Sequence, residues 1–115
     1  MHMSIDVSTC VFYGWKINDF DKFNKNLTEE ELQELYENSN LIDINGWNIS
    51  DILFGEVIYW SEDLYENFYL DLNSNSFNEQ LAKAEQRLED TLSIYRDKIE
   101  LPNDIPHLMI ARIFS

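Results

Sequence analysis

The sequence predicts an α+β domain in which one mostly antiparallel sheet carries helices on one face. The chain has 115 residues, which is the usual size of one domain. Hydrophobic residues make up 44% of it, and only three Gly and two Pro interrupt it, so a packed core is expected. Segments with a hydrophobic period of two alternate with segments of helical period. We place the domain at residues 3–115 and interpret residues 1–2 as an expression remnant, because a second Met follows His2.

The first expected element is a strand over residues 4–17. Apolar and β-branched residues occupy every second position there, which is typical of a strand. Gly14 lies near the end of this segment, so it marks either a bulge or the end of the strand.

Helical signals follow over residues 19–38. Asp19 is a good N-cap, and Thr28 with Glu31 forms the sequence pattern of a capping box. Leu32, Leu35 and Tyr36 supply the apolar stripe behind it. This segment predicts two short helices or one bent helix.

Two further strands are expected in the middle of the chain. Residues 41–44 form a short apolar run that ends at an Asn-Gly turn signal. Residues 51–60 are almost continuously apolar, as in a strand that is buried on both faces. Residues 67–72 fit an extra strand or a short helical turn, and we favour the strand.

The clearest helix is expected at residues 77–98, with Ser76 as its N-cap and Glu79 completing a capping box. After Pro106, residues 107–114 form a last strand that is apolar on both faces. The resulting order is βαββαβ, which is the split βαβ layout of ferredoxin-like folds. The segment at residues 67–72 could add one extra strand. No internal repeat or linker indicates a second domain.

Charge is distributed unevenly along the chain. The formal net charge is −14, and residues 26–82 contain thirteen acidic residues and no Lys or Arg. Such a field repels nucleic acid and anionic membranes and attracts a cationic partner. The sequence also has no run of roughly 18–20 apolar residues that could span a bilayer and no signal peptide. Together with a single cysteine, this favours the cytoplasm.

The sequence gives little indication of chemistry. Residues 71–75 have the opening pattern of a calcium loop, but Ser76 and Ala82 stand where Gly and a bidentate Glu are needed, so we expect a turn and a helix cap. His107 has no Cys or His nearby, and Cys10 has no basic neighbour, so we expect a surface histidine and a core thiol. Nucleotide-binding and hydrolase motifs are absent. We therefore expect no catalytic residue, metal or cofactor, and no enzyme activity.

One stretch, residues 59–71, interleaves five aromatic residues with four acids and contains no basic residue. Exposed Tyr and Trp are frequent anchors of protein interfaces, and acids around them steer a basic partner. The alternative is a hairpin whose aromatic side chains fill the core. We add Trp47, near the Asn-Gly turn, and expect the partner-binding residues to be Trp47, Trp60, Glu62, Asp63, Tyr65, Glu66, Tyr69 and Asp71.

These observations favour a small acidic inhibitor or decoy that binds a cationic protein, one that itself normally holds nucleic acid. Twelve Asn and twelve Ile suggest a low-GC bacterium or its phage. In size and charge the chain resembles the small acidic proteins that phages use against host defences, including anti-CRISPR and anti-restriction proteins. The resemblance implies a nucleic-acid mimic that acts in the host cytoplasm. The alternative is a structural or ligand-sensing ferredoxin-like module that self-associates through its sheet, as a homodimer for example.

Overall fold

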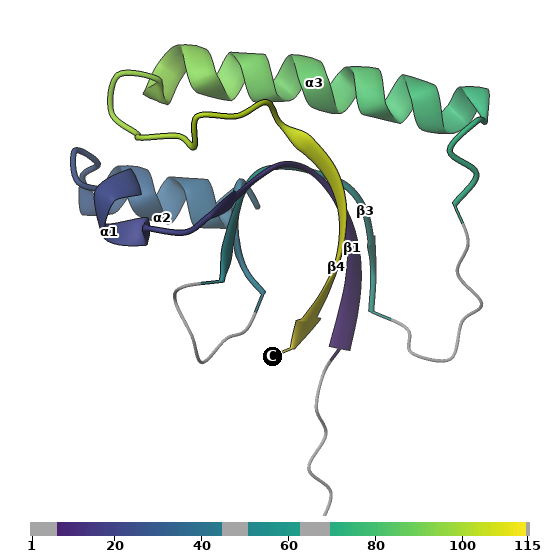
Figure 1. Cartoon of the computed structure of the whole chain (residues 1–115), viewed down its shortest axis with the longest axis horizontal. Helices are drawn as coiled ribbons and strands as arrows, with labels where there is room; N and C mark the ends of the chain where they lie inside the picture. The colour runs from purple at the N-terminus through teal and green to yellow at the C-terminus, as the bar shows by residue number, and fades with distance from the viewer. Residues whose placement is uncertain (1–6, 45–50, 63–69, 115) are drawn as a thin grey trace, which may run out of the picture.

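The computed structural model describes residues 7–44, 51–62 and 70–114, and these segments form a four-stranded sheet and three helices (Figure 1). The elements, in chain order, are β1 (Val7–Ile17), α1 (Phe20–Phe23), α2 (Glu29–Glu37), β2 (Leu41–Asp43), β3 (Ile52–Ser61), α3 (Asn75–Tyr95) and β4 (His107–Phe114). The α+β prediction is therefore confirmed. Residues 19–38 form two helices, which was one of the two alternatives.

The sheet has the strand order β2-β3-β1-β4, and every neighbouring pair is antiparallel. β1 and β3 form its centre, and β2 and β4 form its edges. Gly14 lies inside β1 opposite Gly55, where a Cβ atom on Gly14 would lie 2.1 Å from the carbonyl oxygen of Phe54. Gly14 therefore marks a close approach of two backbones, and the bulge falls between Val11 and Phe12 instead.

The strands bend into an arch, with α3 lying across the outside of the arch and α1 and α2 beside one end of it (Figure 1). The helix-bearing face of the sheet holds the larger core cluster, to which all three helices contribute. Phe54 lies at its centre, with its ring centroid 6.2 Å from that of Trp15 and 5.2 Å from that of Phe23. Leu35 of α2 and Leu88 of α3 pack against the same cluster.

The opposite face of the sheet carries a second cluster in which all the buried residues come from strands. They are Cys10, Phe12, Ile42, Leu53 and Ile113. β1 thus contributes apolar side chains to both faces of the sheet. β3 does so too, and it is fully buried from Ile52 to Glu56 and half-buried or exposed beyond.

Several element boundaries differ from those expected, and α3 ends at Tyr95 rather than at residue 98. The capping box at Thr28 is confirmed, but α3 begins at Asn75 because the hydroxyl of Ser74, rather than Ser76, accepts the first helical hydrogen bond, from Phe77 N at 3.0 Å. A turn just before that cap occupies residues 71–74, so the described part of the expected strand at 67–72 belongs to no strand. Residues 67–69 lie outside the described residues.

Candidate interaction surface

Five of the eight expected partner-binding residues lie outside the described part of the chain, namely Trp47, Asp63, Tyr65, Glu66 and Tyr69. Of the other three, Trp60 is near the end of β3 and is 40% exposed. Glu62 is exposed one residue after the strand ends. The bulge in the β1–β3 ladder sets Trp60 opposite Cys10, which places its side chain on the face of the sheet away from the helices.

Asp71 belongs to the turn that leads into α3. Its carboxylate accepts a hydrogen bond from Asn73 N at 3.0 Å, and its carbonyl oxygen accepts one from Ser74 N at 3.1 Å. The side chain is exposed, but one of its carboxylate oxygens is engaged in fixing the turn. This geometry confirms the turn-and-cap interpretation of residues 71–75. Within the described residues, no group of three or more His, Cys, Asp or Glu side chains could hold a metal ion.

The densest exposed acidic surface in the described structure lies on α2. This helix of nine residues contains five glutamates and no basic residue. Glu30, Glu34 and Glu37 are spaced i, i+4 and i+7, so they share one face of the helix, and all three are exposed. Sequence reasoning placed these acids in the negative segment but attributed the contact surface to residues 59–71.

Cations from outside the negative segment offset part of its charge. Lys98 pairs with Glu31, Arg87 with Glu56 at 3.3 Å, and Lys16 with Asp51 at 3.7 Å. The hydrogen bond from Lys98, assisted by one from the Thr28 backbone, holds the pKa of Glu31 below its ordinary value. Segregation of charge along the sequence is therefore only partly preserved in space, and the remaining concentration is the outer face of α2.

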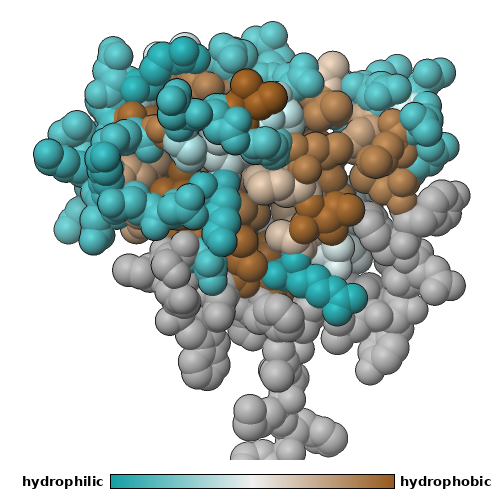
Figure 2. All heavy atoms as spheres, in the orientation of Figure 1, coloured by the Kyte–Doolittle hydropathy of each residue, from teal (hydrophilic) through white to brown (hydrophobic). Residues whose placement is uncertain are grey.

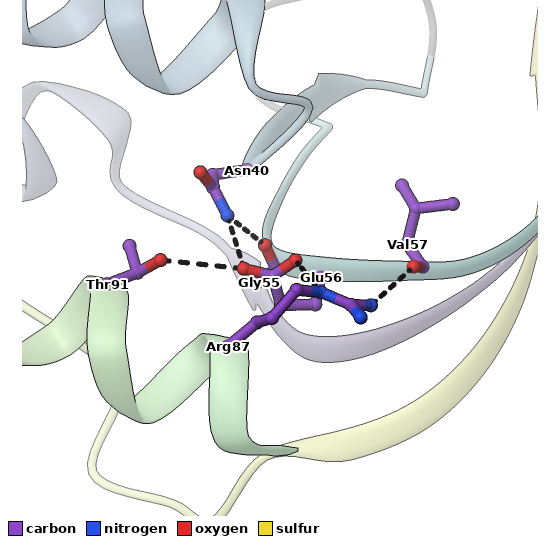
Figure 3. Close-up of polar contacts among 6 residues, drawn as sticks. All are labelled: Asn40, Gly55, Glu56, Val57, Arg87 and Thr91. Carbon is purple, nitrogen blue, oxygen red and sulfur yellow. Dashed lines mark hydrogen bonds and ion pairs between the residues drawn. The ribbon is translucent and has the colours of Figure 1, made fainter. Parts of the chain in front are cut away.

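A second polar site lies beneath α3, where the carboxylate of Glu56 is held between three elements (Figure 3). Asn40 Nδ2 donates to Glu56 Oε1 and to the carbonyl of Gly55, at 2.8 Å each. Thr91 Oγ1 donates to Oε1 at 3.5 Å, and Arg87 Nε donates to Oε2 at 3.3 Å. Arg87 also donates to the carbonyl oxygen of Val57 at 3.3 Å. Each polar side chain of this cluster has a hydrogen-bond partner.

The Glu56 cluster fastens α3 and the start of β2 to the central strand β3. A buried carboxylate with neutral donors and one cation is a stable arrangement, and here both Glu56 oxygens accept hydrogen bonds from within the chain. The sequence contained its signal, since Glu56 is the only charged residue among positions 52–61 of an otherwise apolar strand. The apolar pattern of residues 51–60 predicts a buried strand but not this cluster.

The fold accounts for the surroundings of Cys10, of His107 and of the ion pair between Lys22 and Glu100. Cys10 is fully buried, and burial raises the pKa of its thiol to about 12, as expected for a core residue. His107 is exposed, with Nε2 at 2.6 Å from Oδ2 of Asp104, and this hydrogen bond lowers the pKa of Asp104. A hollow of about 180 Å³ beside α1 contains Lys22 and Glu100, which already pair with each other at 3.1 Å.

β4 exposes two large aliphatic side chains. Leu108 is 40% exposed and Ile110 is 68% exposed. Figure 2 shows a hydrophobic area below α3, in the region that β4 occupies in Figure 1, and a largely hydrophilic surface over α1 and α2. The sequence predicts a strand that is apolar on both faces, and the structure leaves the Leu108 and Ile110 side chains of that strand exposed to water.

No family model, no curated protein and no solved structure matches this chain. Within the described residues, none of the helices is both long and apolar enough to cross a membrane.

Proposed function

We propose that this protein binds a cationic protein partner and acts as an inhibitor or decoy, with the acidic outer face of α2 as its main steering surface. The observation that carries the proposal is the exposed stripe of Glu30, Glu34 and Glu37 on a helix without a single basic residue. Repulsion between carboxylates at i, i+4 and i+7 costs the fold stability. A stripe of this kind is accounted for by a partner that neutralises it.

The position of these acids within α2 strengthens the argument. Glutamates in the first turn, such as Glu31, stabilise a helix through its dipole and through the capping box. Glu37 is in the last turn, where the dipole disfavours a negative charge and where the helix has no basic residue. Local stability therefore explains the N-terminal acids of α2, and the hydrogen bond that Glu34 accepts from the Tyr95 hydroxyl at 3.1 Å gives Glu34 a role in packing α2 on α3. Glu37 is the acid of the stripe that the fold explains least.

The partner class follows from the same chemistry. A row of negative charges spaced along one surface attracts the basic grooves with which proteins hold nucleic acid. A host nucleic-acid-binding or defence protein, bound by a phage-encoded decoy in the manner of anti-CRISPR and anti-restriction proteins, fits the size, charge and composition of the chain. Trp60 and Glu62, exposed at the end of β3, are the described candidates for additional contacts.

Comparative affinity capture from a low-GC bacterial lysate tests this function. The baits are the wild type, an α2 variant (E30Q/E34Q/E37Q) and an α3 control (E79Q/E85Q/E89Q) with the same net charge. Glutamine preserves the hydrogen bonds that Glu34 and Glu37 accept. We expect a basic protein that the wild type and the control retain and the α2 variant loses. Equal retention by all three baits would contradict the assignment to α2.

A second candidate function, self-association as a ferredoxin-like module, is favoured by the exposed apolar strand β4. We infer a ferredoxin-like layout from two observations. The elements occur in the order strand, helices, two strands, helix and strand, and the strand order is β2-β3-β1-β4 with all neighbours antiparallel. Interstrand proton contacts measured by NMR test the inference, and a strand order without β1 and β3 at the centre would refute it.

A further inference from the structure

The outer edge of β4 is open and apolar. The β1–β4 register sets Leu108 opposite Tyr13 and Ile110 opposite Val11, so both side chains point to the helix-bearing face. α3 packs over β3 and β1. β4 lies beyond them, which explains why Ile110 remains 68% exposed. Within the described residues no strand pairs with the outer edge of β4, and every second residue of an edge strand directs its N–H and C=O groups outward.

The two edges of the sheet are protected very differently. β2 is only three residues long and ends in Asp43, and short or charged edge strands resist pairing with other chains. β4 is eight residues long and contains no proline and no acid, and Arg112 is its only permanent charge. Natural sheets seldom leave such an edge uncovered, because it is a template for another strand.

We propose that β4 pairs, antiparallel and edge to edge, with β4 of a second copy of this chain. The charge distribution favours a second copy of the chain as the partner of β4. Residues 105–115 contain no acid in a protein with 22 acidic residues, so two copies can meet there without opposing carboxylates. The acidic helix α2 packs on β2, at the opposite edge. In the paired sheet the two α2 helices are roughly 30 Å apart, several times the screening length of about 8 Å in physiological salt.

The side chains of β4 are also self-complementary in one register. A twofold axis at Ile110 sets this residue opposite Ile110 of the second copy on the helix-bearing face. Leu108 then lies opposite Arg112, whose aliphatic stem can cover it, and the two arginines stay apart. On the other face Met109 meets Ala111, a large residue against a small one. This register pairs residues 107–113 of both copies and covers the exposed Leu108 and Ile110 side chains.

This inference rests on the second candidate function and names its partner and its surface. The test measures the mass of the protein by sedimentation velocity from low micromolar to near-millimolar concentration, for the wild type, I110D and I94D. Ile94 on α3 is 66% exposed, so I94D introduces the same charge at an equally exposed isoleucine. We expect wild type and I94D to form dimers, and I110D to associate about 100-fold more weakly, since each copy loses one buried isoleucine.

Cysteine cross-linking gives a second measurement of the same contact. I110C is expected to form a disulfide-linked dimer under mild oxidation, while I94C is not, and the native Cys10 is buried and does not compete. A wild type that stays monomeric throughout, or an I110D variant that dimerises like the wild type, would overturn the proposal. Salt separates this contact from the proposed cationic partner, because screening strengthens association between two negative copies and weakens binding of a basic protein.

Discussion

Replacing Arg87 by methionine tests whether the Glu56 cluster fastens α3 to the sheet. Methionine retains most of the aliphatic stem but removes the ion pair with Glu56 and the hydrogen bond to the Val57 carbonyl oxygen. At 3.3 Å and an effective dielectric constant of 20, the Coulomb energy is about 5 kcal/mol. The side chain of Arg87 is 49% exposed and that of Glu56 12%, so solvent screening and desolvation remove most of this energy.

We therefore expect R87M to lower the free energy of unfolding by about 2 kcal/mol, which includes about 1 kcal/mol for the lost hydrogen bond. For a chain of this length, that loss corresponds to a melting temperature lower by about 8 °C. Urea unfolding followed by tryptophan fluorescence measures it at neutral pH. The control is R96M, because the Arg96–Glu89 pair is exposed and 3.8 Å apart. An R87M loss below about 0.5 kcal/mol, or an equal loss in R96M, would refute the reasoning.

Three other predictions concern the core, the thiol and the pH dependence of stability. G14A should lose more than about 3 kcal/mol of stability, since its Cβ would lie 2.1 Å from the carbonyl oxygen of Phe54, and a near-native melting curve would contradict this. Cys10, with a pKa of about 12, should react with a thiol reagent at pH 8 only as fast as the protein unfolds, whereas rapid labelling of the folded protein would show that it is accessible. The pKa of Glu31 in the folded state is below its ordinary value of 4.5, so the contribution of this carboxylate to the free energy of unfolding is complete above pH 4.5 and is lost on acidification through the folded pKa. E31Q should therefore remove this part of the acid sensitivity in urea unfolding measured between pH 7 and pH 3. An unchanged pH profile would disprove this prediction.

Most of the secondary structure could be predicted because its signals are local. Alternation in β1, the capping box at Thr28 and the apolar stripe of α3 each lie within a short window of sequence. The start of α3 was misplaced by two residues because Ser74 and Ser76 are both good N-caps. The choice depends on the Asp71 turn, which fixes the chain before the helix.

The interaction surface was harder to predict because it depends on pairing between distant residues. The sequence correctly indicated a long acidic segment, but not that Lys16, Arg87 and Lys98 would return from elsewhere to neutralise three of its carboxylates. The exposure of Ile110 likewise follows from the position of β4 at the edge of the sheet, beyond the strands on which α3 packs. An apolar strand has the same sequence pattern in the middle of a sheet and at an unprotected edge.

The most direct test of the proposed function is the salt dependence of association between this protein and the basic protein that it captures. Stopped-flow or biosensor kinetics would compare the wild type, E30Q/E34Q/E37Q and the control E79Q/E85Q/E89Q, which has the same net charge as the α2 variant. We predict that the association rate of the wild type and of the control falls about tenfold or more from low to high salt. The α2 variant should associate slowly at low salt and show a much shallower dependence. Identical salt slopes for all three proteins would contradict a steering role for α2.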